Sequence, residues 1–164
     1  MATRSVVREG TIAGVLGALG VSVWFLIIDT VAGVPLLTPA TLGEAFLSLF
    51  GAAQETDGKA LYVGLYTIVH FAAFIALGIV AAAVVRLSER EPSVLAGALI
   101  LFVATQVMFY GISAMLANPR LIGALAWYQV GLANLVAAGL MGMYLWRRHP
   151  QLGTELRRAL AGEE

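Results

Sequence analysis

The sequence predicts an all-α fold, a polytopic membrane protein in which four transmembrane helices form one bundle. The first observation is composition: 60% of the residues are hydrophobic and 12% are charged. Soluble domains carry about 25% charge, so this chain has too much apolar surface to bury in water. The second observation is four long apolar segments, each close to or above the roughly 20 residues that cross a hydrocarbon core of about 30 Å.

These segments make up a single transmembrane domain covering the whole chain. The first apolar run is longer than the roughly 7–15 apolar residues of a secretory signal, so we interpret it as a retained helix. Asn118 and Pro119 supply a cap and a first-turn proline for the last helix, which predicts a helical hairpin there. We place the spans at about 10–34, 61–85, 94–117 and 121–146, followed by a tail at 147–164.

The basic residues predict the orientation of the chain. The first connection contains only Lys59 and the third only Arg120, whereas eight arginines lie in the N-terminal segment, the second connection and the tail. The positive-inside rule therefore places both termini in the cytoplasm. The eight are Arg4, Arg8, Arg86, Arg90, Arg147, Arg148, Arg157 and Arg158.

The loop between the first two spans contains turn signals and a helical pattern. We expect Pro35 to end the first helix, and Gly33 and Gly43 to permit tight backbone geometry or close approach. Thr38 and Pro39 read as a helix cap followed by a first-turn proline. Thr41 and Glu44 form an alternative capping box, which would begin a short amphipathic helix on the outer membrane surface or over the bundle. Its apolar residues are Leu42, Ala45, Phe46, Leu49 and Phe50.

Small residues repeat at four-residue intervals in two of the spans. This spacing lets helix backbones approach closely in lipid. We interpret both faces as contacts within the monomer, and the alternative is contact with a second copy or another protein. The first span carries Gly10, Gly14, Ala18 and Ser22, and the fourth carries Asn134, Ala138 and Gly142.

A few polar side chains fall inside the spans, where each needs a reason because burial in hydrocarbon is costly. Helix lengths place most of them in the outer half of the membrane, where they would form one ligand-binding cluster if they face inward. The candidates are Asp29, Tyr66, His70, Gln106, Tyr110, Gln129 and Asn134.

His70 and Asp29 are the sharpest candidates. For His70 we favour a structural hydrogen bond; the alternatives are a haem or metal ligand, a proton carrier or a partner for a quinone carbonyl. His149 is the only other histidine, and we expect it at the opposite membrane face from His70. A bis-histidine haem is therefore not expected. For Asp29 we favour anchoring of the loop through backbone amides over pairing with His70 or binding a cation.

Other classes of site lack their signatures. There is no cysteine, no Gly-x-Ser-x-Gly, no phosphate-binding glycine loop and no His-Glu-x-x-His, so nothing predicts an enzyme or a metal site. The formal net charge is zero, which gives no case for nucleic acid as a partner. The sequence requires no cofactor.

The segment from Asp29 to Gly43 reads Asp-Thr-Val-Ala-Gly-Val-Pro-Leu-Leu-Thr-Pro-Ala-Thr-Leu-Gly. It resembles a segment in a group of uncharacterised bacterial membrane proteins with four predicted spans, in which a tryptophan-containing first helix ends in Asp before this loop. The resemblance covers most of the chain, but only the loop motif is specific. It implies a bacterial cytoplasmic membrane and no particular activity. The matching positions are Asp29, Gly33, Pro35, Thr38, Pro39, Ala40, Leu42 and Gly43, with Trp24, Phe25, His70 and Phe71 also similar.

The leading functional hypothesis is a non-catalytic accessory or scaffolding subunit of a larger membrane complex. It rests on small size, close-packing faces and the absence of a catalytic set. The second is a helical bundle that binds a small molecule (haem, quinone or lipid) near His70, Tyr66 and Gln106. The third is a small transporter built from an oligomer. All three have the lipid bilayer as a partner.

Overall fold

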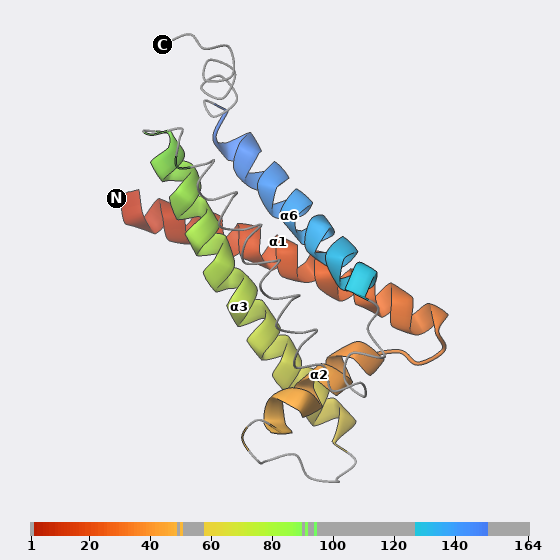
Figure 1. Ribbon diagram of the computed structural model, residues 1–164. Helices are drawn as coiled ribbons and strands as arrows, with labels where there is room; N and C mark the ends of the chain where they lie inside the picture. The colour runs from red at the N-terminus through yellow and green to blue at the C-terminus, as the bar shows by residue number, and fades with distance from the viewer. Residues whose placement is uncertain are drawn as a thin grey trace.

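The computed structural model describes residues 2–48, 50, 58–89, 91, 94 and 127–150, and its regular structure within these ranges is helical (Figure 1). The four helices are α1 (Ala2–Val31), α2 (Leu37–Ser48), α3 (Lys59–Ser88) and α6 (Trp127–Arg148). The predicted third span at 94–117, apart from its first residue, lies outside the described residues. So do the start of the fourth span and the tail beyond residue 150.

Three of these helices are long and apolar enough to cross a membrane: Ser5–Val31, Lys59–Ser88 and Tyr128–Arg148. At 1.5 Å per residue the shortest, with 21 residues, measures about 31 Å, which matches a hydrocarbon core of about 30 Å. Large apolar side chains are exposed along all three, as expected of surfaces that face lipid. The most exposed include Val31, Ile68 and Leu135.

The helix α1 begins earlier than the apolar run predicts. Its first residues are polar, but they are helical from Ala2 onward. Ser5 donates a hydrogen bond from its hydroxyl to Glu9 Oε1 at 2.6 Å, and this pairing one turn apart supports the helix outside the apolar stretch. The end of the molecule that holds the N-terminus of α1 and the C-terminus of α6 is called the terminal end below.

The helix α1 ends in a Schellman motif. The Gly33 amide donates to Thr30 O and the Val34 amide donates to Asp29 O, which satisfies two carbonyls that the helix end would otherwise leave unpaired. Gly33 has a φ of +76°, a conformation that glycine adopts without steric cost. Pro35 follows two residues later and cannot continue the helix. The helix therefore ends before Pro35, as predicted, and Gly33 adopts the tight backbone geometry expected of it.

The helix α2 begins at Leu37, four residues before the predicted capping box at Thr41, and the Thr38 hydroxyl donates to Asp29 rather than capping α2, so both predicted caps were wrong. No amide of its first turn needs a cap from Thr41. The Leu37 amide donates to Val34 O, and the Thr38 amide donates to Asp29 Oδ2. Pro39 has no amide hydrogen, and the Ala40 amide donates to Leu36 O. The decisive cap comes from Asp29 on α1, which no local pattern in α2 could indicate. The end of the molecule that holds α2 is called the loop end below.

The helix α1 lies between α3 and α6 and packs against both, whereas α3 and α6 make few contacts with each other (Figure 1). Against α3, the glycines Gly10 and Gly14 meet Gly78, and a Cβ at any of the three would overlap the backbone of the facing helix. These contacts confirm that the small-residue face of α1 is used within the monomer. Close helix contact of this kind stabilises packing by dispersion rather than by burial from water.

The face of α6 that packs against α1 differs from the predicted face. The buried residues are Ala133, Ala137, Met141 and Leu145, whereas Ala138 and Gly142 are exposed. Among the described helices, Ala138 and Gly142 thus do not make the predicted close contact within the monomer, and Met141 instead fills the space beside Gly17 of α1. Ala138 and Gly142 are therefore not part of the contact with α1, where the small residues Ala133 and Ala137 pack against Val21 and Phe25.

Gly43 of α2 lies against the carbonyl of Tyr62 in α3, where a Cβ would overlap it. This close approach brings α2 across the start of α3, and Lys59 Nζ donates to Pro35 O at 3.0 Å to hold the loop there (Figure 1). The helix α2 is thus packed on the first turns of α3.

Candidate functional site

A small cavity lies at the loop end, between α1, α2 and α3. Its volume is about 150 Å³. Most of its walls are apolar, with a few polar groups from each helix, which is the usual make-up of a small-molecule site. The lining residues are Val21, Ser22, Phe25, Leu26, Asp29, Leu36, Thr38, Pro39, Val63, Tyr66, Thr67 and His70.

Asp29 forms one wall and is 4% exposed. Its Oδ2 accepts the Thr38 amide and its Oδ1 accepts the Thr38 hydroxyl, both at 2.8 Å. The carboxylate also faces the N-terminus of α2, whose dipole favours negative charge. Anchoring of the loop through a backbone amide, the interpretation that we favoured for Asp29, is confirmed. Each carboxylate oxygen keeps a second lone pair that can accept a further hydrogen bond.

His70 forms the opposite wall and is buried. Its Nε2 lies 3.2 Å from Ala18 O, and its Nδ1 lies 3.3 Å from the Tyr66 hydroxyl. Because a carbonyl can only accept, Nε2 carries the proton, and Nδ1 is then free to accept from Tyr66. The imidazole also packs against Phe74, with ring centroids 4.7 Å apart. His70 therefore ties α3 to α1 by a hydrogen bond across the helix contact.

Two further hydroxyl groups line the cavity. Thr67 donates back to Val63 O at 2.7 Å within its own helix. The Ser22 hydroxyl has no hydrogen-bond partner in the described part of the chain, so it can donate to or accept from a bound molecule. Neither was predicted as a lining residue, although Ser22 lies two helical turns before Asp29 and on the same face.

The structure brings together only some of the predicted candidates. Asp29, Tyr66 and His70 converge on the cavity together with Thr38 and Pro39. The loop residues Gly33, Pro35 and Gly43 shape the loop without lining it. Gln129 and Asn134 lie on α6 and do not line the cavity. Gln106 and Tyr110 fall outside the described residues.

The arrangement suits binding better than covalent chemistry. His70 Nε2 and the Asp29 carboxylate each form hydrogen bonds that join separate helices, and no nucleophile lies beside a free base among the residues named above. In the described ranges no group of three or more metal-binding side chains comes together. At about 150 Å³ the cavity is smaller than the roughly 300–1,000 Å³ of sites for drug-sized ligands.

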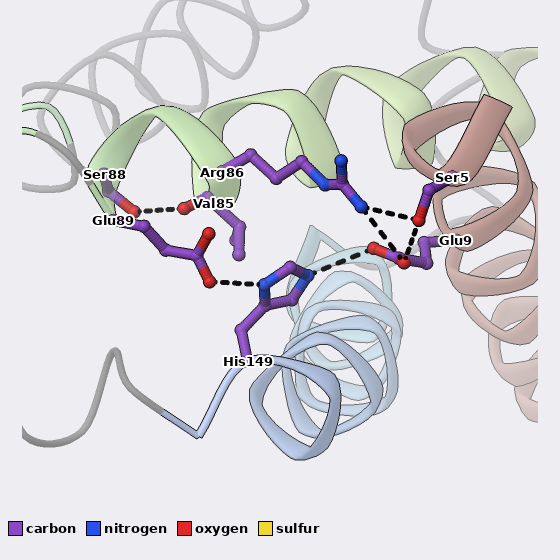
Figure 2. A network of polar contacts seen from close by, with 7 residues as sticks. All are labelled: Ser5, Glu9, Val85, Arg86, Ser88, Glu89 and His149. Carbon is purple, nitrogen blue, oxygen red and sulfur yellow. Dashed lines mark hydrogen bonds and ion pairs between the residues drawn. The ribbon is translucent and has the colours of Figure 1, made fainter. Parts of the chain in front are cut away.

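A second polar cluster lies at the terminal end and joins three helices (Figure 2). His149 places Nδ1 2.7 Å from Glu89 Oε1 and Nε2 3.1 Å from Glu9 Oε2. Arg86 lies 3.4 Å from Glu9 Oε1 and also donates to the Ser5 hydroxyl at 2.5 Å. Sequence reasoning missed this cluster, since only the Ser5–Glu9 spacing is local. It is a structural clamp between α1, α3 and the end of α6.

Taken together, these features define a helical protein that has three helices long and apolar enough to cross a membrane and a small, mostly apolar cavity at one end. In comparisons with known proteins, no protein-family model, no curated protein and no solved structure matches the chain.

Proposed function

We propose that this protein binds a small, mostly apolar molecule carrying a hydroxyl group, in the loop-end cavity. The proposal includes a four-span bundle in a bacterial cytoplasmic membrane, with both termini in the cytoplasm and the loop end on the outer side. The observation that carries it is the convergence of Asp29, Tyr66, His70 and Ser22, from two transmembrane helices, on one cavity closed by α2.

The size of the cavity limits what enters it. A volume of about 150 Å³ is that of an apolar cavity that accepts a benzene-sized molecule. One six-membered ring therefore fits, and any alkyl chain on the ring must extend toward the surrounding lipid. Phe25 and Val63 supply apolar walls for such a ring.

The polar groups select a hydroxyl over a carbonyl. Asp29 and Tyr66 can each accept a hydrogen bond through a lone pair. Neither can donate one to the ligand, because the Asp29 carboxylate has no hydrogen and the Tyr66 hydroxyl already donates to His70. Ser22 is the remaining group that can donate. A phenol or quinol can donate its O–H to one of these acceptors. A quinone carbonyl can only accept, and Ser22 is then its one hydrogen-bond partner. Leaving the acceptors unpaired disfavours the carbonyl form.

The test is binding of 4-butylphenol and its methyl ether to the purified protein in lipid nanodiscs, measured by equilibrium dialysis. The two probes have similar apolar bodies, and only the phenol has a hydroxyl to donate. We expect the phenol to bind about tenfold more tightly, corresponding to one hydrogen bond to a charged acceptor. Ser22→Phe fills the cavity and should abolish binding of both probes.

Thr30→Ala is the matched control, because Thr30 is exposed on the same helix and its side-chain hydroxyl bonds only to Leu26 O in the described structure. It should leave binding unchanged. Equal affinity for phenol and ether would contradict the hydroxyl-binding proposal, and binding that survives Ser22→Phe would place the probes in the lipid rather than in the cavity.

The second proposal is an accessory subunit of a larger membrane complex. A groove between α1 and α6 supports it, because the buried Trp24 indole N–H beside this groove has no hydrogen-bond partner in the described part of the chain. We propose a partner helix that presents an acceptor there. The groove is otherwise apolar, lined by Leu16, Leu19, Gly20, Val23, Ile27, Val136 and Leu140.

Purification in gentle detergent, followed by mass spectrometry of stoichiometric companions, tests this second proposal. A constant companion that is lost in Gly20→Phe would support it, because the phenylalanine blocks the groove. Isolation of the chain alone, as a monomer or as a homo-oligomer, would overturn it.

A further inference from the structure

A second hollow, at the terminal end, is lined by two arginines. Its volume is about 230 Å³, and it lies between the first turns of α1 and the last turns of α6. It is separate from the loop-end cavity and shares no residue with it. Its lining residues are Ser5, Arg8, Glu9, Tyr144 and Arg148.

The two arginines are available to an anion. Arg8 and Arg148 are exposed, and neither forms an ion pair with another residue in the described ranges. The Arg148 guanidinium lies over the Tyr144 ring, 5.6 Å from its centroid. A guanidinium held on an aromatic face keeps its in-plane N–H groups for an oxygen acceptor.

The one carboxylate in the hollow is already matched by its neighbours. Glu9 Oε1 accepts the Ser5 hydroxyl and faces Arg86, and Glu9 Oε2 faces His149 (Figure 2). The negative charge of Glu9 is therefore directed into the clamp rather than toward Arg8 and Arg148. The lining retains an excess of positive charge.

Tyr144 provides an independent sign that an acceptor is missing. Its hydroxyl oxygen is buried and has no hydrogen-bond partner among the residues that the structure describes. A buried hydroxyl without a partner costs about 1–3 kcal/mol, so such groups are uncommon. A ligand oxygen in the hollow would satisfy it.

We propose that this hollow binds the phosphate of an anionic phospholipid headgroup, through Arg8 and Arg148 with a hydrogen bond from the Tyr144 hydroxyl. A lipid is the source we commit to, because the hollow lies where the apolar stretches of α1 and α6 end, at the depth of headgroups. Basic pockets at the cytoplasmic ends of transmembrane helices suit such headgroups. This inference does not depend on the ligand of the loop-end cavity.

The experiment measures retention of phosphatidylglycerol. The full chain, purified in detergent, is titrated with phosphatidylglycerol or phosphatidylcholine, and bound lipid is counted by native mass spectrometry. We expect phosphatidylglycerol to bind preferentially, and Arg8→Gln and Arg148→Gln each to weaken it about fivefold. Tyr144→Phe changes no charge and should weaken it by a similar factor through the lost hydrogen bond.

Arg147→Gln is the matched control, since Arg147 is the exposed neighbour of Arg148 but does not line the hollow. If it weakens retention as much as Arg148→Gln, the attraction is spread over the surface and the proposed site is wrong. Unchanged retention in Tyr144→Phe would also overturn the site. If inorganic phosphate at millimolar concentration displaces the lipid completely, the hollow binds free phosphate and the lipid assignment fails. Circular dichroism of each variant checks that the helices remain intact.

Discussion

Removing the carboxylate of Asp29 should release α2 from the rest of the molecule. The Asp29 carboxylate is 4% exposed and accepts two hydrogen bonds from Thr38, one from the amide and one from the hydroxyl. It is the only group that caps the Thr38 amide in the described structure. The variant Asp29→Ala leaves that amide buried without an acceptor.

The expected magnitude follows from these two bonds. A hydrogen bond to a charged group contributes about 1.5–3 kcal/mol, and loss of a helix cap costs about 0.5–2 kcal/mol. Because both bonds end on one residue, we expect Asp29→Ala to lower the stability of the α2 segment by about 3–5 kcal/mol. Thr38→Val removes the hydroxyl bond alone and should cost about 1–2 kcal/mol.

Hydrogen exchange of a peptide covering residues 34–45 measures this effect in the intact protein. A loss of about 3 kcal/mol of local stability accelerates exchange by about 100-fold. Thr30→Ala is the control, since its exposed hydroxyl bonds only within α1. If Asp29→Ala and Thr30→Ala exchange at the same rate as the unmodified protein, Asp29 does not hold α2 and the reasoning is refuted.

Three further predictions concern packing, the clamp and the loop backbone. Gly14→Leu should lower the free energy of unfolding in detergent by about 3 kcal/mol or more, because a side chain there overlaps the α3 backbone. Gly142→Ala is the control. Gly142 has open space around it, so this change should be neutral or slightly stabilising. His149→Ala should lower the free energy of unfolding by about 1–3 kcal/mol, because it removes both carboxylate contacts. A double-mutant cycle with Glu89→Gln should show that the two side chains are coupled, and additive effects would contradict the clamp. Leu36 has a φ of 63°, so Leu36→Gly should raise the unfolding midpoint by relieving about 1 kcal/mol of strain, and a lowered midpoint would contradict this prediction.

Local chemistry made several features predictable from sequence. The lengths of the apolar runs indicated helices long enough to span a membrane, and three of the helices in the structure meet that criterion. Gly33 and Pro35 marked the end of α1 because a left-handed C-terminal residue and a proline stop a helix through interactions within a few residues. The spacing of Gly10 and Gly14 indicated a close helix contact, because small residues four apart let two helix backbones approach each other.

The candidate site was only partly predictable. Polar residues in apolar spans named Asp29, Tyr66 and His70, because burial of such groups in hydrocarbon requires a reason. Sequence could not show that they meet, since His70 bonds to Ala18 across 52 residues of chain. Gln129 and Asn134 are also polar residues in an apolar span, but they lie on α6 and do not line the cavity.

The sequence by itself determined that the described structure has three long apolar helices, that α1 ends before Pro35 and which residues are small enough for close packing. The tertiary structure alone decided which helix faces meet. Successive residues of an α-helix are separated by about 100° around its axis, so the one-residue difference between Ala138 and Ala137 decides exposure or burial. That rotation is fixed by the fit of side chains such as Met141 against the neighbouring helix, and it depends on both surfaces at once.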